Sequence, residues 1–141
     1  MKQERSSSTD TIPRDADGGA KRGSDKVRAI NAVAVKKIRA GDFQGALNLL
    51  RKIVYPGDGG FWNDEAPACA QVNFAVALYL DYRWEASLKL VHEFVGEDLE
   101  TRETRMIREW YDQLSRWQRV QLWLGMRIPL ADLGPDAGVL N

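Results

Sequence analysis

The chain has few of the residues from which metal and redox sites are built. Its 141 residues include one cysteine and one histidine, and 20 Lys and Arg residues are balanced by 20 Asp and Glu residues. A lone Cys69 cannot form an internal disulfide, and a zinc site of the usual composition needs more His or Cys ligands than one chain offers. A net charge of zero creates no overall field that would attract nucleic acid or anionic lipid. We therefore expect no metal and no cofactor.

Long hydrophobic runs are missing as well. The longest apolar stretch covers residues 72–80 and is interrupted by Asn73, whereas a membrane-spanning helix needs roughly 20 apolar residues. The first residues are polar where a secretory signal would have an apolar core. These features predict a cytoplasmic protein that makes no membrane contact.

Motifs of known catalytic sites are also missing. His92 lies beside the apolar stripe of its segment, as a surface histidine would, and Cys69 stands between two alanines, as a packing residue would. The glycine-rich stretch 57–60 lacks the Lys-Ser/Thr that follows in a phosphate-binding loop. Its neighbours Phe61 and Trp62 either fasten this loop to the core or contact a partner, and the first role is favoured. The sequence predicts a protein that is not an enzyme.

What the chain has in abundance is helical periodicity. Apolar residues recur at spacings of three and four, and no segment alternates with the period of a strand, so the predicted fold is all-α. We expect a disordered N-terminal tail over residues 1–23, a helical domain over residues 24–125 and a C-terminal tail over residues 126–141. The expected helices cover 24–41, 42–54, 64–80, 84–96 and, as one long capping helix, 101–125.

Two of these helices begin with a similar pattern. Phe43 is followed by Ala46 and Leu47, and Trp84 is followed by Ser87 and Leu88. An aromatic residue followed three positions later by a small one lets two antiparallel helices approach closely. In this respect the region 27–96 resembles the tetratricopeptide repeat family, whose units are helix pairs of about 34 residues. Phe43 and Trp84 lie 41 residues apart, so the resemblance requires an insertion, which we place in the 55–63 loop.

The resemblance implies a concave groove lined by the first helix of each pair, on which an extended peptide or a partner helix binds. In this sequence the groove residues would be Arg28, Asn31, Val35, Arg39, Asn73, Val76 and Tyr79. Family members that hold a C-terminal carboxylate use Lys and Asn at such positions. Asn73 aligns with one of them, but Val35 stands where another Asn is expected. The implied function is therefore an adaptor, scaffold or assembly subunit that binds a protein or peptide, without a carboxylate clamp.

A second candidate surface lies on the far side of the expected helix 101–125. There Trp123 is placed with Arg105, Arg116 and Arg119, a composition enriched at binding hot spots. Alternatively, Ile128, Pro129, Leu130 and Leu133 fold back and cover Trp123. A nucleic-acid-associated protein that uses these arginines together with Arg102 and Arg108 is the alternative function, which the interleaved acidic residues disfavour. Association with further copies of the chain stays open.

Overall fold

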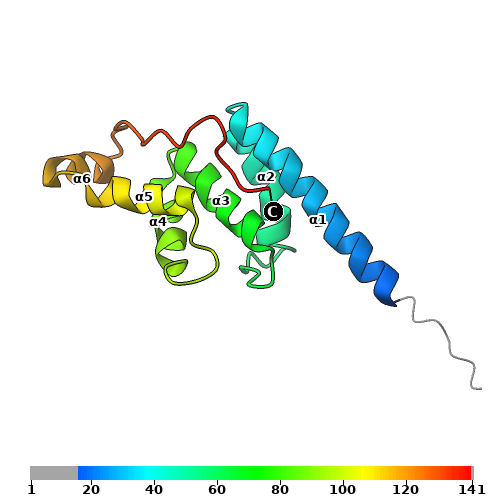
Figure 1. Ribbon diagram of the computed structural model, residues 1–141. Coiled ribbons are helices and arrows are strands. Elements are labelled where there is room, and N and C mark those ends of the chain that lie inside the picture. The colour runs from blue at the N-terminus through cyan, green and yellow to red at the C-terminus, as the bar shows by residue number, and fades with distance from the viewer. Residues whose placement is uncertain (1–15, 141) are drawn as a thin grey trace, which may run out of the picture.

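The computed structural model describes residues 16–140, and within this part of the chain all regular structure is helical (Figure 1). The predicted all-α fold class is confirmed in this respect. Six helices follow one another along the chain, namely α1 (Ala16–Arg39), α2 (Phe43–Val54), α3 (Ala68–Leu80), α4 (Trp84–Glu93), α5 (Arg102–Asp112) and α6 (Arg116–Trp123).

Helix α3 is the centre of the fold. Every residue from Ala70 to Tyr79 is buried, as its uniformly apolar sequence predicts. It packs against α1, α2, α4 and α5, whereas α2 and α4 lie on either side of it without contacting each other. Ser87 of α4 donates a hydrogen bond to the carbonyl of Ala75 at 2.7 Å. This small residue lets the two helices approach closely.

Helix α1 begins earlier than predicted. It starts at Ala16 rather than at Ser24, so residues 16–23 are helical where a disordered tail was expected; the remainder of that tail, residues 1–15, lies outside the described residues. The apolar stripe that holds α1 to the protein starts only near Val27. Once those turns are formed, each further residue costs little to add to the helix. Apolar periodicity marks the packed part of α1 and misses the exposed part.

The prediction of one long C-terminal helix over residues 101–125 is wrong, because two helices occupy this region. Helix α5 ends at Asp112, and α6 begins after Ser115. The Ser115 side chain accepts a hydrogen bond from the Gln118 N–H, and the Gln118 side chain accepts one from the Ser115 N–H. This reciprocal capping box specifies a new helix start. The change of direction invalidates side-chain positions extrapolated along one continuous helix.

The C-terminal residues do not form a separate tail. Residues 126–140, which we call the strap, leave α6 and run without regular structure back along α5 and α3 to α1 (Figure 1). Ile128, Leu133 and Ala137 of the strap are buried in the hydrophobic core. The domain predicted to end at residue 125 therefore includes the strap.

Candidate functional site

The strap lies against one side of α1, α3 and α5, which we call the strap-binding face. Its first half is held by groups of α3 and α5. The Trp110 indole donates to the Pro129 carbonyl at 3.0 Å, and the Tyr79 hydroxyl accepts from the Ala131 N–H at 2.7 Å. The Arg102 guanidinium donates to the Leu133 carbonyl at 2.9 Å. All three bonds join a side chain of the face to the main chain of the strap.

The second half of the strap is held by two asparagines. The Asn73 amide nitrogen donates to the Val139 carbonyl at 2.7 Å, and its side-chain oxygen accepts from the Val139 N–H at 2.6 Å. Asn31 donates to the same carbonyl at 3.0 Å and accepts from Asn73 at 2.8 Å. Both asparagines are fully buried. Arg39 adds weaker bonds, at 3.3 Å each, to the carbonyls of Asp136 and Ala137.

Apolar contacts fix the register of the strap. Leu133 is 2% exposed and anchors its middle. At Gly138 the backbone φ is +102°, and an added Cβ would lie 3.2 Å from Val35 and 3.4 Å from the Asn73 side-chain oxygen. Both the backbone angle and the available space therefore favour glycine. The strap thus meets the face with a large apolar residue, Leu133, and with a glycine five residues later, Gly138.

The structure brings together most of the groove residues predicted from the sequence. Asn31, Val35, Asn73, Val76 and Tyr79 are all buried, and Arg39 bonds to the strap from its exposed position. Arg28 is exposed on α1 and has no hydrogen bond or ion pair among the described residues.

Sequence reasoning did not assign Arg102 and Trp110 to this face, nor Leu133 and Gly138 of the strap to the contact with it. The only local signal for the strap residues was the turn-rich sequence Leu133-Gly134-Pro135-Asp136-Ala137-Gly138. Such a sequence excludes helix without indicating where the segment packs.

Burial under the strap changes the acidity of Tyr79. Its hydroxyl is removed from water between α3 and α5, and this raises the pKa of Tyr79 to about 12. The hydrogen bond from Ala131 opposes the shift but is the smaller effect. The ring of Tyr79 also packs edge-on against Trp110, with ring centroids 5.1 Å apart. The neutral phenol is thus part of the strap-binding face.

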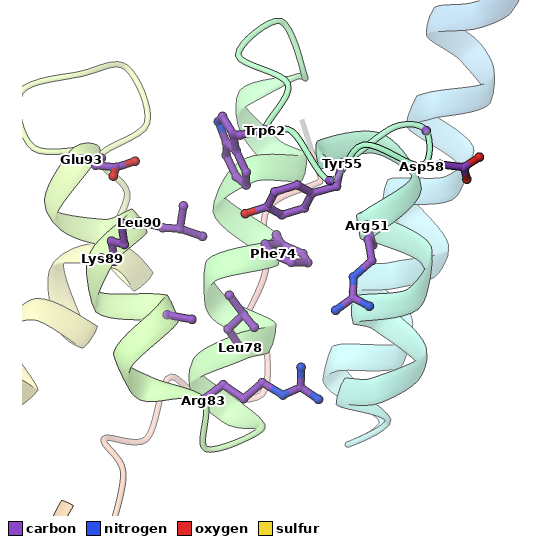
Figure 2. A pocket seen from close by; sticks show the side chains of 13 residues that line it. Arg51, Tyr55, Asp58, Trp62, Phe74, Leu78, Arg83, Lys89, Leu90 and Glu93 are labelled. Atoms are coloured by element: carbon purple, nitrogen blue, oxygen red, sulfur yellow. The ribbon is translucent and has the colours of Figure 1, made fainter. Parts of the chain in front are cut away.

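A cavity of about 730 Å³ opens on the opposite side of α3, between α2 and α4 (Figure 2). Trp62 packs against Tyr55 and Phe74 at its upper end, with ring centroids 5.3 and 6.2 Å away. Phe61, in contrast, is 81% exposed. Trp62 therefore fastens the loop to the core as predicted, whereas Phe61 does not.

The charged residues around this cavity are of both signs. Arg51, Arg83 and Lys89 line it together with Asp58 and Glu93. In Figure 2 the guanidinium groups of Arg51 and Arg83 both extend into the gap between α2 and α4. Arg83 forms an ion pair with Asp81 at 3.0 Å.

The second candidate surface divides at the break between α5 and α6. Arg105 of α5 lies 4.0 Å from Glu100, far along the chain from Trp123 at the end of α6. Trp123 is 81% exposed, so the strap does not cover it. The prediction that Trp123 and Arg105 share one side of a single helix loses its basis. Arg116 and Arg119 remain in the same helix as Trp123.

Other groups with chemical potential lie apart from one another. His92 is exposed on α4, and Cys69 is a free, partly buried thiol at the start of α3. Within residues 16–140, His, Cys, Asp and Glu side chains form no group of three that would hold a metal ion. None of the described helices has the length and apolar composition needed to cross a bilayer.

Comparisons with protein-family models, with curated proteins and with solved structures found no match to this chain. Its function must therefore be argued from the strap-binding face and from the exposed surface.

Proposed function

We propose that the protein is a non-enzymatic interaction module that holds an extended peptide on the face of α1, α3 and α5. The observation that carries this proposal is the pair of hydrogen bonds between Asn73 and both main-chain groups of Val139. A side-chain amide that pairs with an N–H and a carbonyl of one residue recognises extended backbone rather than a particular side chain. The strap is then an intramolecular ligand of this face.

The other contacts support the same proposal. Tyr79, Trp110, Arg39 and Arg102 also bond to strap main chain. Selectivity among peptides would come from the buried apolar site that Leu133 occupies and from the limited space around Gly138. The resemblance to tetratricopeptide repeats is consistent with this role, because α1 and α3 are the helices that would line the groove. A partner peptide with the same spacing would compete with the strap, as expected of an adaptor or scaffold.

The alternative of nucleic-acid binding receives less support. Arg108 and Arg105 both lie near Glu100, and the ion pair with Arg108 lowers the pKa of that carboxyl group. Arg102 bonds to the strap, and Arg119 stacks on the ring of Tyr111 with 4.7 Å between its guanidinium carbon and the ring centroid. Four of the five arginines considered for phosphate binding thus already have partners.

The proposal is tested by supplying the strap in trans. The variant Leu133→Asp places a carboxylate in a buried apolar seat, which favours release of the strap from an otherwise intact chain. A fluorescein-labelled peptide of residues 126–141 is then titrated with the variant, and binding is followed by fluorescence anisotropy. We expect saturable binding to Leu133→Asp and weaker apparent binding to the unmodified chain, because a tethered strap competes at an effective concentration on the order of millimolar.

Two controls make the result specific. A peptide of the same composition in scrambled order should not bind, and adding Asn73→Ala to the Leu133→Asp variant should weaken binding by about 5- to 150-fold. Circular dichroism establishes that each variant keeps its helices. If folded Leu133→Asp protein does not bind the peptide, or binds the scrambled peptide equally well, the face is not a peptide-binding site.

A further inference from the structure

Helix α6 presents large apolar side chains to solvent. Trp117 is 65% exposed, Val120 42%, Trp123 81% and Leu124 59%. At 100° per residue these four positions fall within an arc of about 120°, which we call the outward face of α6. Leu122 points to the other side and is buried at 4% exposure. The helix therefore packs on the protein through one buried apolar residue and exposes four apolar residues to solvent.

The exposed area is large for a helix of two turns. A large aromatic side chain buries 150–250 Å², so the two indoles alone expose roughly 200–350 Å². With Val120 and Leu124 added, the exposed apolar area approaches the roughly 300–600 Å² of the largest patch on a typical monomer, which is often functional. Figure 1 places α6 at one end of the molecule, away from α1 and α2. The outward face is therefore accessible to a large partner.

The charged side chains of α6 itself are of one sign. From Gln113 to Ala131 the chain contains Arg116, Arg119 and Arg127 and no acidic residue. Arg116 falls within the same arc as the apolar residues. Arg119 lies just outside this arc and stacks on Tyr111, whereas Arg127 stacks on Tyr82 on the side of Leu122, each with 4.7 Å between the guanidinium carbon and the ring centroid. An apolar surface with a cationic border complements an apolar surface with an anionic border.

We propose that the outward face of α6 binds an amphipathic helix of another protein, in which a stripe of apolar residues is flanked by carboxylates. The indoles of Trp117 and Trp123 pack against the stripe, and the arginines pair with the flanking acids. This site is separate from the strap-binding face and does not depend on the function proposed for it.

Two other occupants fit the surface less well. A symmetric contact with a second copy would bring the arginines of the two copies together with no carboxylate on either face to neutralise them. Helices that lie on a lipid surface are rich in Lys and Arg on the polar face opposite their apolar face, whereas α6 has two arginines and one of them, Arg116, falls within the apolar arc.

The test uses the full chain and two synthetic helical peptides. Each peptide is about 18 residues, or five turns, long. Both have a leucine stripe, which is flanked by Glu in the acidic peptide and by Lys in its basic twin. Binding is followed through the indole N–H signals of the five Trp residues in a two-dimensional NMR spectrum, assigned with single Trp→Phe variants. We expect the acidic peptide to shift the signals of Trp117 and Trp123 and to leave those of Trp62, Trp84 and Trp110 in place.

The variants assign the contact to the outward face. Trp123→Ala should weaken binding of the acidic peptide at least about tenfold, as expected for a hot-spot residue. Phe61→Ala is the matched control, because Phe61 has the same exposed fraction of 81% and lies in a distant loop. Arg116→Glu should weaken binding of the acidic peptide and strengthen binding of the basic twin. Circular dichroism checks that each variant is folded.

Several outcomes would overturn the proposal. They are equal binding of the two peptides, no shift of the Trp117 and Trp123 signals at millimolar acidic peptide, and an unchanged affinity in Trp123→Ala. Phosphatidylglycerol vesicles and a dilution series are run in parallel. If only vesicles perturb these signals, the surface is a lipid-binding one; if only raising the protein concentration does so, the surface joins copies of the chain.

Discussion

Replacing Asn73 by alanine should release the end of the strap without unfolding the helices. Asn73 makes two hydrogen bonds to the main chain of Val139 and one to Asn31, and its side chain is fully buried. Alanine removes all three bonds and leaves Asn31 with fewer partners. Both main-chain groups of Val139 can recover their hydrogen bonds from water once the strap moves away.

The expected size of the effect follows from these bonds. Loss of the two bonds to Val139 destabilises only the state in which the strap is docked. Loss of the bond to Asn31 affects the docked and the released state alike, so it does not change the docking equilibrium. Two bonds at about 0.5–1.5 kcal/mol each weaken docking by roughly 1–3 kcal/mol, which is about a 5- to 150-fold change in the docking equilibrium. The helices pack on one another without the two Asn73–Val139 bonds. The free energy of unfolding of the whole domain should therefore fall by less than the free energy of strap docking.

Hydrogen–deuterium exchange measures this local effect directly. The amide of Val139 and those of its strap neighbours should exchange faster in Asn73→Ala by the same factor as the docking equilibrium changes, whereas amides within α3 and α4 should keep their protection. Asn48→Ala is the matched control, because Asn48 is exposed on α2. If the strap amides of Asn73→Ala exchange at the same rate as in the unmodified protein, although the variant is less stable overall, Asn73 does not hold the strap.

Three further perturbations test other parts of the structure. Gly138→Ala should weaken strap docking by roughly 1–3 kcal/mol, because the backbone φ at this position is +102°. Unchanged hydrogen–deuterium exchange of the strap amides would contradict this. The pKa of Tyr79 is about 12 in the folded protein against an ordinary value of 10.0. Its contribution to stability should therefore be fully present below pH 10 and be lost between pH 10 and 12, because the tyrosine of the unfolded chain ionises first. Urea unfolding of Tyr79→Phe should lack this step, and an identical step in both proteins would exclude Tyr79. Ala46→Leu should destabilise the protein by roughly 1–3 kcal/mol through overpacking, because Ala46 is fully buried, whereas Leu at exposed Ala86 should not.

The parts of the fold that were predicted correctly depend on local signals. Apolar periodicity located α2, α3 and α4, and the predicted start of the second helix at residue 42 coincides with the cap of α2, where the Asp42 side chain accepts from the Gly45 N–H at 2.9 Å. The break at Ser115 also has a local signal, the Ser115-x-x-Gln118 capping box. Apolar spacing continues across this break, so periodicity alone predicts one continuous helix.

The strap could not be placed from the sequence for a different reason. Its path depends on main-chain groups that meet Asn31, Asn73 and Tyr79, and main-chain groups are the same in every residue. Asn31 and Asn73 were predicted to line a groove, and in the structure their buried amides find the partners that buried amides need in the main chain of the strap. Nothing in the sequence identified the chain's own residues 126–140 as that partner.

The strap also has a consequence for the order in which the protein folds. Its hydrogen bonds to the helices join residues that are between 19 and 109 positions apart in the sequence, whereas α2, α3 and α4 pack mainly on their neighbours in the chain. Contacts between distant residues require more loop-closure entropy, so they form late. The helices should therefore assemble first, and the face of α1, α3 and α5 should stay uncovered until the strap arrives. During that interval the nascent domain is most vulnerable to aggregation, and a chaperone would find its apolar surface there.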